Sequence, residues 1–338
     1  MTSPSCVSAG SRICACSPVG DGHRSTVGSG SGPEEIFMQH KPIEEQVIVV
    51  TGASSGIGLC TALLAAERGA SVWLLARSRR TLDEVVGVIG EGSGRAHALC
   101  VDVSARDQVD AAVQEILAAE GRIDTWVNNA GVAIYGRLDE VAEKDHRRLF
   151  DVNFWGLVNG SLAALPALRA SGGVLVNVGS EVSDAVLPLQ GMYAASKHAV
   201  KGFTDALRVE QTHVDDAQVS IVLVQPTAVN TPYPQHARNY MGREPKLPEP
   251  TIDPQRVAET ILHAASHGGR DLKVGAMAHL DTFVSKLIPR LGDRMTALQA
   301  GRQQHDEPPL QPLGTLHTPG ESGRIHGLDA HGEILERS

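Results

Sequence analysis

The sequence has no long apolar run, few cysteines and no cluster of basic residues. No apolar stretch reaches the roughly 18 to 20 residues that a membrane-spanning helix requires, and no signal-peptide core stands near the N-terminus. We therefore expect a cytoplasmic protein with no spanning membrane segment. A net charge of −9, without a block of Lys and Arg, also argues against a nucleic-acid partner.

The five cysteines do not form a metal-binding pattern. Cys6, Cys14 and Cys16 lack the paired Cys-x-x-Cys or His partners that zinc requires. Cys60 and Cys100 fall in a helical pattern and a strand pattern, where small apolar packing is the expected role. We expect no metal.

What the chain does contain is a regular alternation of short apolar strands and helical patterns. Its 338 residues, 42% of them hydrophobic, are enough to bury a sizeable core. Val-rich strands separated by helices indicate a parallel sheet covered on both faces. We predict a single α/β domain with a Rossmann-like, doubly wound parallel sheet and helices on both faces. The expected strands are 47–50, 71–76, 96–101, 123–127, 174–179 and 219–225.

The two ends of the chain differ in composition from its middle. Residues 1–42 are rich in Ser and Gly, so we expect a disordered N-terminal extension, within which Met38 is an alternative start. The catalytic domain is expected over 43–275. An amphipathic helical segment is expected over 276–303, and a disordered, polar, Gly/Pro-rich tail over 304–338.

A glycine-rich turn joins the first strand to the first helix. Residues 51–58 read Thr-Gly-Ala-Ser-Ser-Gly-Ile-Gly. Gly52 permits the tight turn, Gly56 lets backbone amides approach a pyrophosphate, and Gly58 allows close helix–strand packing. A nucleotide is the expected ligand, and the loop residues that we expect to bind it are Gly52, Ala53, Ser54, Ser55, Gly56, Ile57 and Gly58.

Four further motifs follow in a fixed order. Asn-Asn-Ala-Gly occupies 128–131, Asn153 lies in a helical segment, Ser180 closes a strand, and Tyr193 precedes Lys197 by four residues. Together with the Gly-x-x-x-Gly-x-Gly spacing, this order resembles the short-chain dehydrogenase/reductase (SDR) family. The resemblance covers residues 43–275 and implies the same Rossmann-like fold.

The end of the second strand bears on the choice of cofactor. An acidic residue there would bind the ribose 2′-hydroxyl of NAD, whereas an Arg accommodates the 2′-phosphate of NADP. No carboxylate follows Ala76, and Arg77 with Arg79 and Arg80 can pair with phosphate. NADP(H) is therefore preferred over NAD(H). The alternative is that these arginines form a solvated helix start, which would leave the choice open.

Other cofactor contacts are implied by the resemblance alone. Asp102 and Val103 correspond to the adenine contact, and Asn129 to a contact on the ribose side. Val229 and Thr231 match positions that hold the nicotinamide amide.

Two positions depart from the family pattern. Thr227 stands after Pro226 where the family usually has Gly, and a β-branched residue restricts that turn. Glu181 places a carboxylate directly after Ser180 and matches no family role.

The motif residues imply a proton relay. Hydride transfer between nicotinamide and a carbonyl carbon requires a proton at the oxygen, and Tyr193 is the candidate donor or acceptor. A nearby cation lowers the pKa of a Tyr, and Lys197 lies on the same helix face. By resemblance, Lys197 also binds the nicotinamide ribose, Ser180 orients the substrate oxygen, and Asn153 holds a water that links Lys197 to solvent. All four are our candidate catalytic residues.

The predicted function is an NADP(H)-dependent oxidoreductase that interconverts a secondary alcohol and a ketone or aldehyde. Candidate lining residues are 133–135, 182–189, Tyr233 and Tyr240, and most are apolar or aromatic. They favour a moderately hydrophobic small-molecule substrate. By resemblance, the Pro-rich stretch 226–252 covers it.

Two alternatives remain open, together with the oligomeric state. A non-catalytic NADP-binding regulator would be expected to lack a catalytic residue, and all four are present. An epimerase or dehydratase of the extended SDR branch would have a larger C-terminal domain and another glycine spacing. By resemblance, we expect a homodimer or homotetramer formed through the helices near 147–170 and 192–214.

Overall fold

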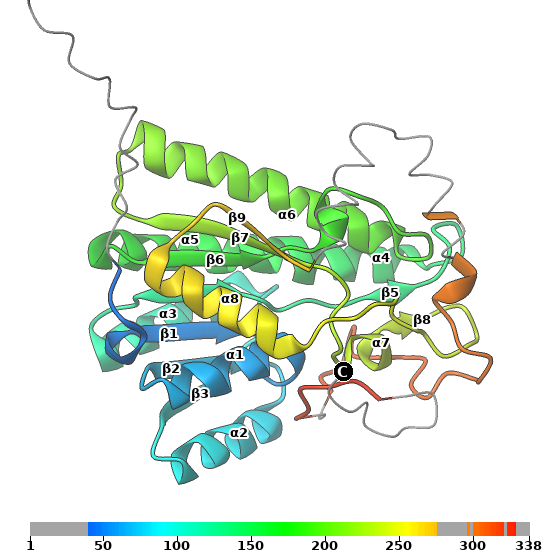
Figure 1. Ribbon diagram of the computed structural model, residues 1–338, viewed down its shortest axis with the longest axis horizontal. Coiled ribbons are helices and arrows are strands. Elements are labelled where there is room, and N and C mark those ends of the chain that lie inside the picture. The colour runs from blue at the N-terminus through cyan, green and yellow to red at the C-terminus, as the bar shows by residue number, and fades with distance from the viewer. Residues whose placement is uncertain (1–39, 276–295, 298–299, 321–322, 329–338) are drawn as a thin grey trace, which may run out of the picture. The chain divides into compact units, whose positions relative to one another are not determined.

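A parallel sheet forms the centre of the protein (Figure 1). The computed structural model describes residues 40–275, 296–297, 300–320 and 323–328. In this part of the chain, seven strands pair in the order β3-β2-β1-β4-β6-β7-β9, and every pair is parallel. The strands are β1 (Val47–Thr51), β2 (Ser71–Ala76), β3 (Arg95–Cys100), β4 (Thr125–Asn128), β6 (Val174–Val178), β7 (Ser220–Pro226) and β9 (Asp271–Val274). The predicted doubly wound fold is confirmed.

All six predicted strands are present, and the seventh was missed. Strand β9 reads Asp-Leu-Lys-Val and lies at the edge of the sheet, beside β7. Only Val274 of its four residues is buried. Because an edge strand is covered less than a central one, its sequence lacks the apolar run by which the others were recognised.

Helices cover both faces of the sheet. On one face, α1 (Gly56–Glu67), α2 (Arg79–Glu91) and α8 (Pro254–His267) pack on the side chains of Ile48, Val50 and Leu74. On the other, α3 (Arg106–Glu120), α5 (Gly156–Ser171) and α6 (Gly191–Val209) pack on Val49 and Leu75. Successive residues of β1 and β2 thus alternate between two cores, which explains why both strands are apolar except at Thr51 and Ser71.

Two helices continue into short π-helical turns. Helix α4 (Glu143–Phe150) runs through the turn Asp151–Trp155 into α5, and α6 runs into the turn Glu210–Val214. A π-helical turn contains one residue more than an α-helical turn, and such turns often occur at functional sites. The first of them contains Asn153.

The Pro-rich stretch 226–252 carries secondary structure of its own. It contains the short helix α7 (Tyr233–His236) and the strand β8 (Arg238–Asn239), which pairs in parallel with β5 (Ile134–Tyr135). This pairing docks the stretch onto the segment that follows β4. Figure 1 shows α7, β5 and β8 together, at the side toward which the β1 arrow points.

The C-terminal segment differs from our expectation of a disordered tail over 304–338. Its described part, 304–320 and 323–328, lies against the domain beside α7 and β8 (Figure 1). Asn239 N donates to Pro312 O at 3.0 Å, and Leu316 is fully buried. Backbone hydrogen bonds and one apolar side chain hold the segment, and neither leaves a periodic sequence pattern. Of the predicted amphipathic segment, residues 276–295 and 298–299 lie outside the described residues, as do 1–39 of the predicted extension.

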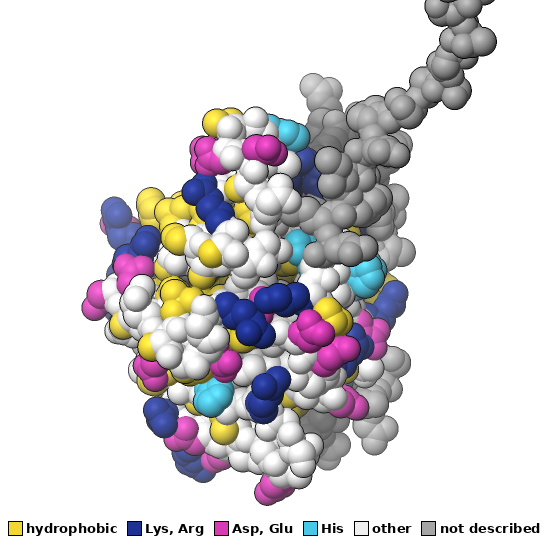
Figure 2. Space-filling view, turned by 90° about the vertical axis from the view of Figure 1, so that its left-hand side faces the viewer, with side chains coloured by type: hydrophobic (Ala, Val, Ile, Leu, Met, Phe, Trp, Pro, Cys, Tyr) yellow, Lys and Arg dark blue, Asp and Glu magenta, His cyan; other side chains and the backbone are white. Residues whose placement is uncertain are grey.

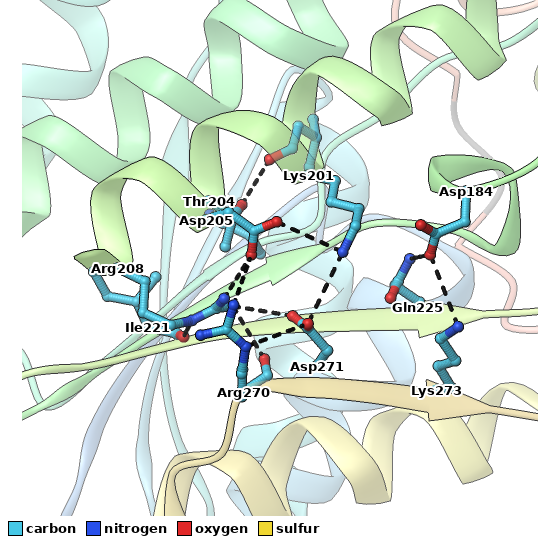
Figure 3. Close-up of polar contacts among 12 residues, drawn as sticks. Asp184, Lys201, Thr204, Asp205, Arg208, Ile221, Gln225, Arg270, Asp271 and Lys273 are labelled. Atoms are coloured by element: carbon cyan, nitrogen blue, oxygen red, sulfur yellow. Dashed lines mark hydrogen bonds and ion pairs between the residues drawn. The ribbon is translucent and has the colours of Figure 1, made fainter. Parts of the chain in front are cut away.

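A network of ion pairs ties α6 to the edge of the sheet (Figure 3). Arg208 of α6 donates to Asp205 at 2.6 Å, to Asp271 of β9 at 3.1 Å and to the carbonyl oxygen of Ile221 at 2.8 Å. Lys201 lies 3.6 Å from Asp205 and 3.9 Å from Asp271. Since the Arg208 side chain is only 7% exposed, its charge depends on these partners. The network fixes the helix that carries Tyr193 and Lys197.

Charges of both signs are interspersed on the face seen in Figure 2, with apolar side chains between them. No helix among the described residues combines the length and apolar character needed to cross a bilayer.

Gly58→Ala tests the close packing of α1 on the sheet. A methyl group at position 58 would lie 2.3 Å from the carbonyl oxygen of Gly52, which is a main-chain atom that cannot move aside. We expect the free energy of unfolding to fall by about 1–3 kcal/mol in a denaturant titration. The matched control is Gly87→Ala in α2, where a methyl group meets nothing within 4 Å and should add about 0.5–1 kcal/mol. Equal effects of the two substitutions would contradict the packing argument.

Candidate active site

A cavity of about 250 Å³ opens where β1, β2, β4, β6 and β7 end. Ligand sites in open α/β sheets occupy this position, outside the carboxyl ends of the strands. The predicted site residues that line the cavity are Gly52, Ser54, Ser55, Gly56, Ile57, Arg77, Asp102, Val103, Asn129, Ser180, Tyr193, Lys197, Val229 and Thr231. Ala53, Gly58 and Asn153 do not line it.

The glycine loop has the backbone that a dinucleotide cradle requires. Gly52 and Gly56 have φ values of 68° and 54°, in the left-handed region that other residues rarely adopt. Gly58 faces Gly52, as described above. Ala53 is fully buried and belongs to the core beneath the loop. The loop and the start of α1 therefore fit a pyrophosphate, whose charge the helix N-terminus favours.

Hydrogen bonds between β1 and the Asn-Asn-Ala-Gly motif hold this loop. Thr51 Oγ1 accepts from Asn129 N at 3.0 Å and from Ala130 N at 3.1 Å. The Asn129 side-chain amide donates to Thr51 O at 3.0 Å and to Gly52 O at 3.3 Å. Asn129 thus braces the loop, and its contact on the ribose side stays a prediction.

Arg77 differs in its surroundings from the two arginines that follow it. Arg77 lines the cavity, and its Nη2 and Nη1 donate to the carbonyl oxygens of Thr315 and Leu316, the second at 3.3 Å. Arg79 and Arg80 instead pair with carboxylates one turn along α2 and are exposed. Of the three, only Arg77 faces the cavity, and the other two behave as a solvated helix start.

Asp102 and Val103 lie at the same end of the cavity. The Asp102 carboxylate accepts from Ser104 Oγ at 2.7 Å and from Arg148 Nη2 at 2.6 Å. Val103 joins a hydrophobic cluster that contains Leu316. The C-terminal segment thus forms a wall beside the residues predicted to contact adenine.

Tyr193 is partly buried and lies beside Ser180 and Tyr233. Burial raises the pKa of Tyr193 to about 12, and the charge of Glu181 raises it further, while hydrogen bonding to Ser180 and Tyr233 acts in the opposite direction. The Tyr193 and Tyr233 rings meet edge to face, with centroids 5.4 Å apart. The phenol is therefore protonated at neutral pH.

Lys197 does not have the expected effect on this pKa. Its Nζ donates to Val178 O at 2.8 Å and lies 5.7 Å from the centroid of the Tyr193 ring. Burial lowers the pKa of Lys197 to about 8. We expected the ammonium to lower the Tyr193 pKa, but Lys197 is buried and Tyr193 is partly buried, and the loss of solvation of the phenolate is the larger effect.

Asn153 holds the motif loop against α6. Its Oδ1 accepts from Val132 N at 2.8 Å, and its Nδ2 donates to Val132 O at 3.0 Å and to Ser196 Oγ at 3.2 Å. Ser196 directly precedes Lys197. The side-chain amide is thus engaged by protein groups, and the predicted water link to Lys197 stays a prediction.

The two departures from the family pattern contact each other. Thr227 Oγ1 donates to Glu181 Oε2 at 2.6 Å, and both residues line the cavity. Thr227 N also donates to Val274 O at 3.0 Å, which ties this turn to β9. Val229 and Thr231 follow it and are almost fully buried. Sequence reasoning named Thr227 and Glu181 separately, because nothing along the chain relates two positions so far apart.

The predicted substrate-lining residues divide into two groups. Ala133, Val182, Leu187 and Tyr233 line the cavity. Ile134, Tyr135 and Tyr240 do not line it, and neither do residues 183–186, 188 and 189, which corrects the prediction for these positions. Ile134 and Tyr135 form β5 and face the core, and Tyr240 Oη donates to Asp145 Oδ2 at 2.7 Å.

Several lining residues were missed. Gln190 and His236 contribute polar groups, and Leu247 and Pro248 contribute apolar surface from the Pro-rich stretch. Thr315, Pro319 and Gly320 come from the C-terminal segment. The composition of that segment predicted disorder, so no sequence signal indicated that it would reach the cavity.

Known proteins share this arrangement. The family model described as short chain dehydrogenase matches residues 46–241. The uncharacterized oxidoreductase YxnA of Bacillus subtilis is 40% identical over 278 residues, which cover 81% of this chain and 78% of that protein.

Two solved structures are also similar. An alcohol dehydrogenase from the archaeon Thermococcus sibiricus, complexed with 5-hydroxy-NADP, is 26% identical with a TM-score of 0.59. A metagenomic short-chain oxidoreductase in complex with NADP is 29% identical with a TM-score of 0.57. Each match covers 68% of this chain and 95% of the other. The chain belongs to the short-chain dehydrogenase family, and it is an oxidoreductase of that family.

Asn153→Ala tests the brace between the motif loop and α6. The substitution removes three hydrogen bonds and leaves the Val132 amide and carbonyl buried without this partner. We expect the free energy of unfolding to fall by about 1–3 kcal/mol in a urea titration. Asn159→Ala, which removes a single half-buried hydrogen bond to Val103 O, should cost less than about 1 kcal/mol. Equal losses of stability in the two variants would show that the three hydrogen bonds of Asn153 contribute no more than the single bond of Asn159.

Proposed function

We propose that this protein is an NADP(H)-dependent oxidoreductase that interconverts a secondary alcohol and a ketone or aldehyde. The observation that carries the proposal is that one cavity is lined by the glycine loop, Ser180, Tyr193 and Lys197. The glycine loop joins β1 to α1, whereas Ser180, Tyr193 and Lys197 belong to the β6–α6 unit, far away along the chain. Their convergence gives the cavity both a nucleotide cradle and a proton donor.

The donor set at one end of the cavity favours NADP(H) over NAD(H). Strand β2 ends without a carboxylate that could bind a ribose 2′-hydroxyl, and Arg77 lines the cavity directly after it. Two structural relatives were solved with NADP or 5-hydroxy-NADP. We assign the pyrophosphate to Gly52–Gly58 and the adenine side to Asp102 and Val103. Asn129 is assigned to the ribose side, and Val229 and Thr231 to the nicotinamide amide. When bound, the cofactor supplies or accepts the hydride.

The chain's own residues handle the proton. Tyr193 is protonated at neutral pH, so it can donate its proton to the oxygen of a carbonyl substrate during reduction. Ser180 hydrogen-bonds the same oxygen and orients it. Lys197 would bind the nicotinamide ribose, and Asn153 positions that part of α6 through its hydrogen bond to Ser196, the residue before Lys197. The raised pKa keeps Tyr193 in the protonated form that reduction of a carbonyl requires at neutral pH.

The other end of the cavity favours a moderately hydrophobic substrate. Val182, Leu187, Tyr233 and Leu247 supply apolar surface there, while the Glu181–Thr227 pair adds one polar edge. A small molecule with an apolar body and one polar substituent fits this lining.

We also propose a homodimer or homotetramer formed through α5 and α6. Trp155, Leu162 and Val209 are 53%, 40% and 48% exposed on these helices and their π-helical turns. Exposed aromatic and aliphatic side chains on these two helices favour an interface. Sedimentation of the purified chain measures the assembly directly.

Tyr193→Phe tests the proton donor. Without the hydroxyl, we expect turnover with NADPH to fall by about 100- to 10,000-fold, while the affinity for NADPH is retained. The measurement follows loss of NADPH, and separately NADH, by absorbance across a panel of ketones, aldehydes and quinones. Tyr240→Phe removes a hydroxyl outside the cavity and serves as the matched control.

Two results would contradict the proposal. Equal turnover in wild type and Tyr193→Phe would exclude the phenol as the acid. Tight NADPH binding without turnover on any carbonyl would instead support a regulatory protein that binds NADP and does not catalyse.

Glu181→Gln tests the electrostatic effect of this carboxylate. Its charge raises the Tyr193 pKa, so the neutral amide should lower that pKa. Below the pKa, the fraction of phenolate grows as the pKa falls, so alcohol oxidation at a fixed alkaline pH should be faster in the variant. The measurement is the rate of NADP reduction against pH.

Gln at position 181 still accepts a hydrogen bond from Thr227, so the change is mainly one of charge. Glu84→Gln makes the same charge change on the exposed face of α2 and should leave the profile unmoved. A shift of equal size in both variants would show that the effect comes from the net charge of the protein. No shift in either variant would show that Glu181 does not influence the pKa of Tyr193.

A further inference from the structure

The C-terminal segment reaches the glycine loop outside the region matched by the family model. The carbonyl oxygen of Arg324 accepts from Gly56 N, the first residue of α1, at 2.9 Å. Gly327 N donates to Asn230 Oδ1 at 3.3 Å, and Gln235 Nε2 donates to Leu328 O at 3.2 Å. These bonds place Arg324 beside the start of α1.

Among the described residues, the Nε donor of Arg324 has no hydrogen-bond partner. This nitrogen is buried, and across 40–275, 296–297, 300–320 and 323–328 no hydrogen-bond acceptor meets it. Within the same ranges, Arg324 forms no ion pair. A buried donor without an acceptor is costly, and a cation without a counter-charge is more so, unless a ligand supplies both.

Two other basic side chains lie nearby. His236 lines the cavity, and burial lowers its pKa to about 4, with the charges of Arg324 and Arg77 acting in the same direction. His236 O accepts from Thr315 N at 2.7 Å, and Thr315 O accepts from Arg77 Nη2. Arg77 and His236 line one end of the cavity, and Arg324 lies close enough for its charge to act on His236.

The acidic group that acts on Arg77 is already engaged. Asp102 attracts Arg77, but its carboxylate accepts hydrogen bonds from Arg148 and Ser104. Arg77 uses two of its five donors on the carbonyl oxygens of the C-terminal segment, so others remain. Two guanidinium groups with donors to spare form the arrangement that recognises a phosphate.

We propose that Arg324 binds the 2′-phosphate of NADP(H) together with Arg77, so that the C-terminal segment completes the cofactor site. The inference rests on the proposed function, because it assumes that the cavity binds a nicotinamide dinucleotide. It adds a residue that discriminates between the two dinucleotides and lies outside the matched residues 46–241. The carbonyl contacts from Thr315 and Leu316 then serve to orient Arg77 toward the same group.

Arg324→Gln in the full-length protein tests the assignment through the dissociation constants for NADPH and NADH, measured by calorimetry. Loss of a charge-assisted pair should weaken NADPH binding by about 10- to 100-fold. NADH, which has no 2′-phosphate, should change by less than about threefold, within the small effect expected of a remote charge. Arg302→Gln, an exposed position in the same C-terminal stretch, is the matched control and should change neither constant.

A second variant separates a ligand from a structural role. Arg324→Lys keeps the charge but loses the bidentate fork, so it should recover part of the NADPH affinity. Equal weakening of NADPH and NADH, or a gain in NADPH affinity, would overturn the assignment.

A further comparison distinguishes this inference from the proposed function. If Arg77→Gln weakens NADPH binding and Arg324→Gln does not, the inference fails while the proposed function stands. If the wild-type protein binds neither dinucleotide, both fail.

Discussion

The close approach of α1 to the sheet at Gly58 is the constraint on which the rest of the site depends. The missing side chain leaves room for Gly52 O and the Asn129 amide, which sit against each other at the end of β1. That contact brings the N-terminus of α1 to the carboxyl edge of the sheet, where five strand ends open the cavity. The positive φ angles of Gly52 and Gly56 follow from the same turn.

Helix α6 needs to be held as firmly as the loop, because it carries both Tyr193 and Lys197. Its C-terminal half is tied to β7 and β9 through Arg208, and its N-terminal half is tied to the motif loop through Asn153. Both anchors are polar and mostly buried. Such groups specify one position for a helix, since a shift would leave them without partners.

The sequence predicted those parts of the molecule whose signals are local. Apolar runs revealed six strands, and the glycine spacing located the loop, because both patterns depend on neighbouring residues. Strand β9 and the position of the C-terminal segment were not predicted, since their partners lie far away along the chain. The direction of the Tyr193 pKa shift was also predicted wrongly. It depends on the loss of solvation, which arises only when the fold brings Ser180, Tyr193 and Tyr233 together. The contact between Thr227 and Glu181 could not be predicted either, because the two residues meet only in the folded chain.

The C-terminal segment is synthesised after every strand of the described sheet. The sheet and its covering helices can therefore assemble on the ribosome before Thr315 and Gly320 are available to wall the cavity. A chain truncated after β9 would retain every strand of the described sheet and yet present an open groove on this side of the cavity. Synthesis of the segment thus separates the folded domain from the finished site.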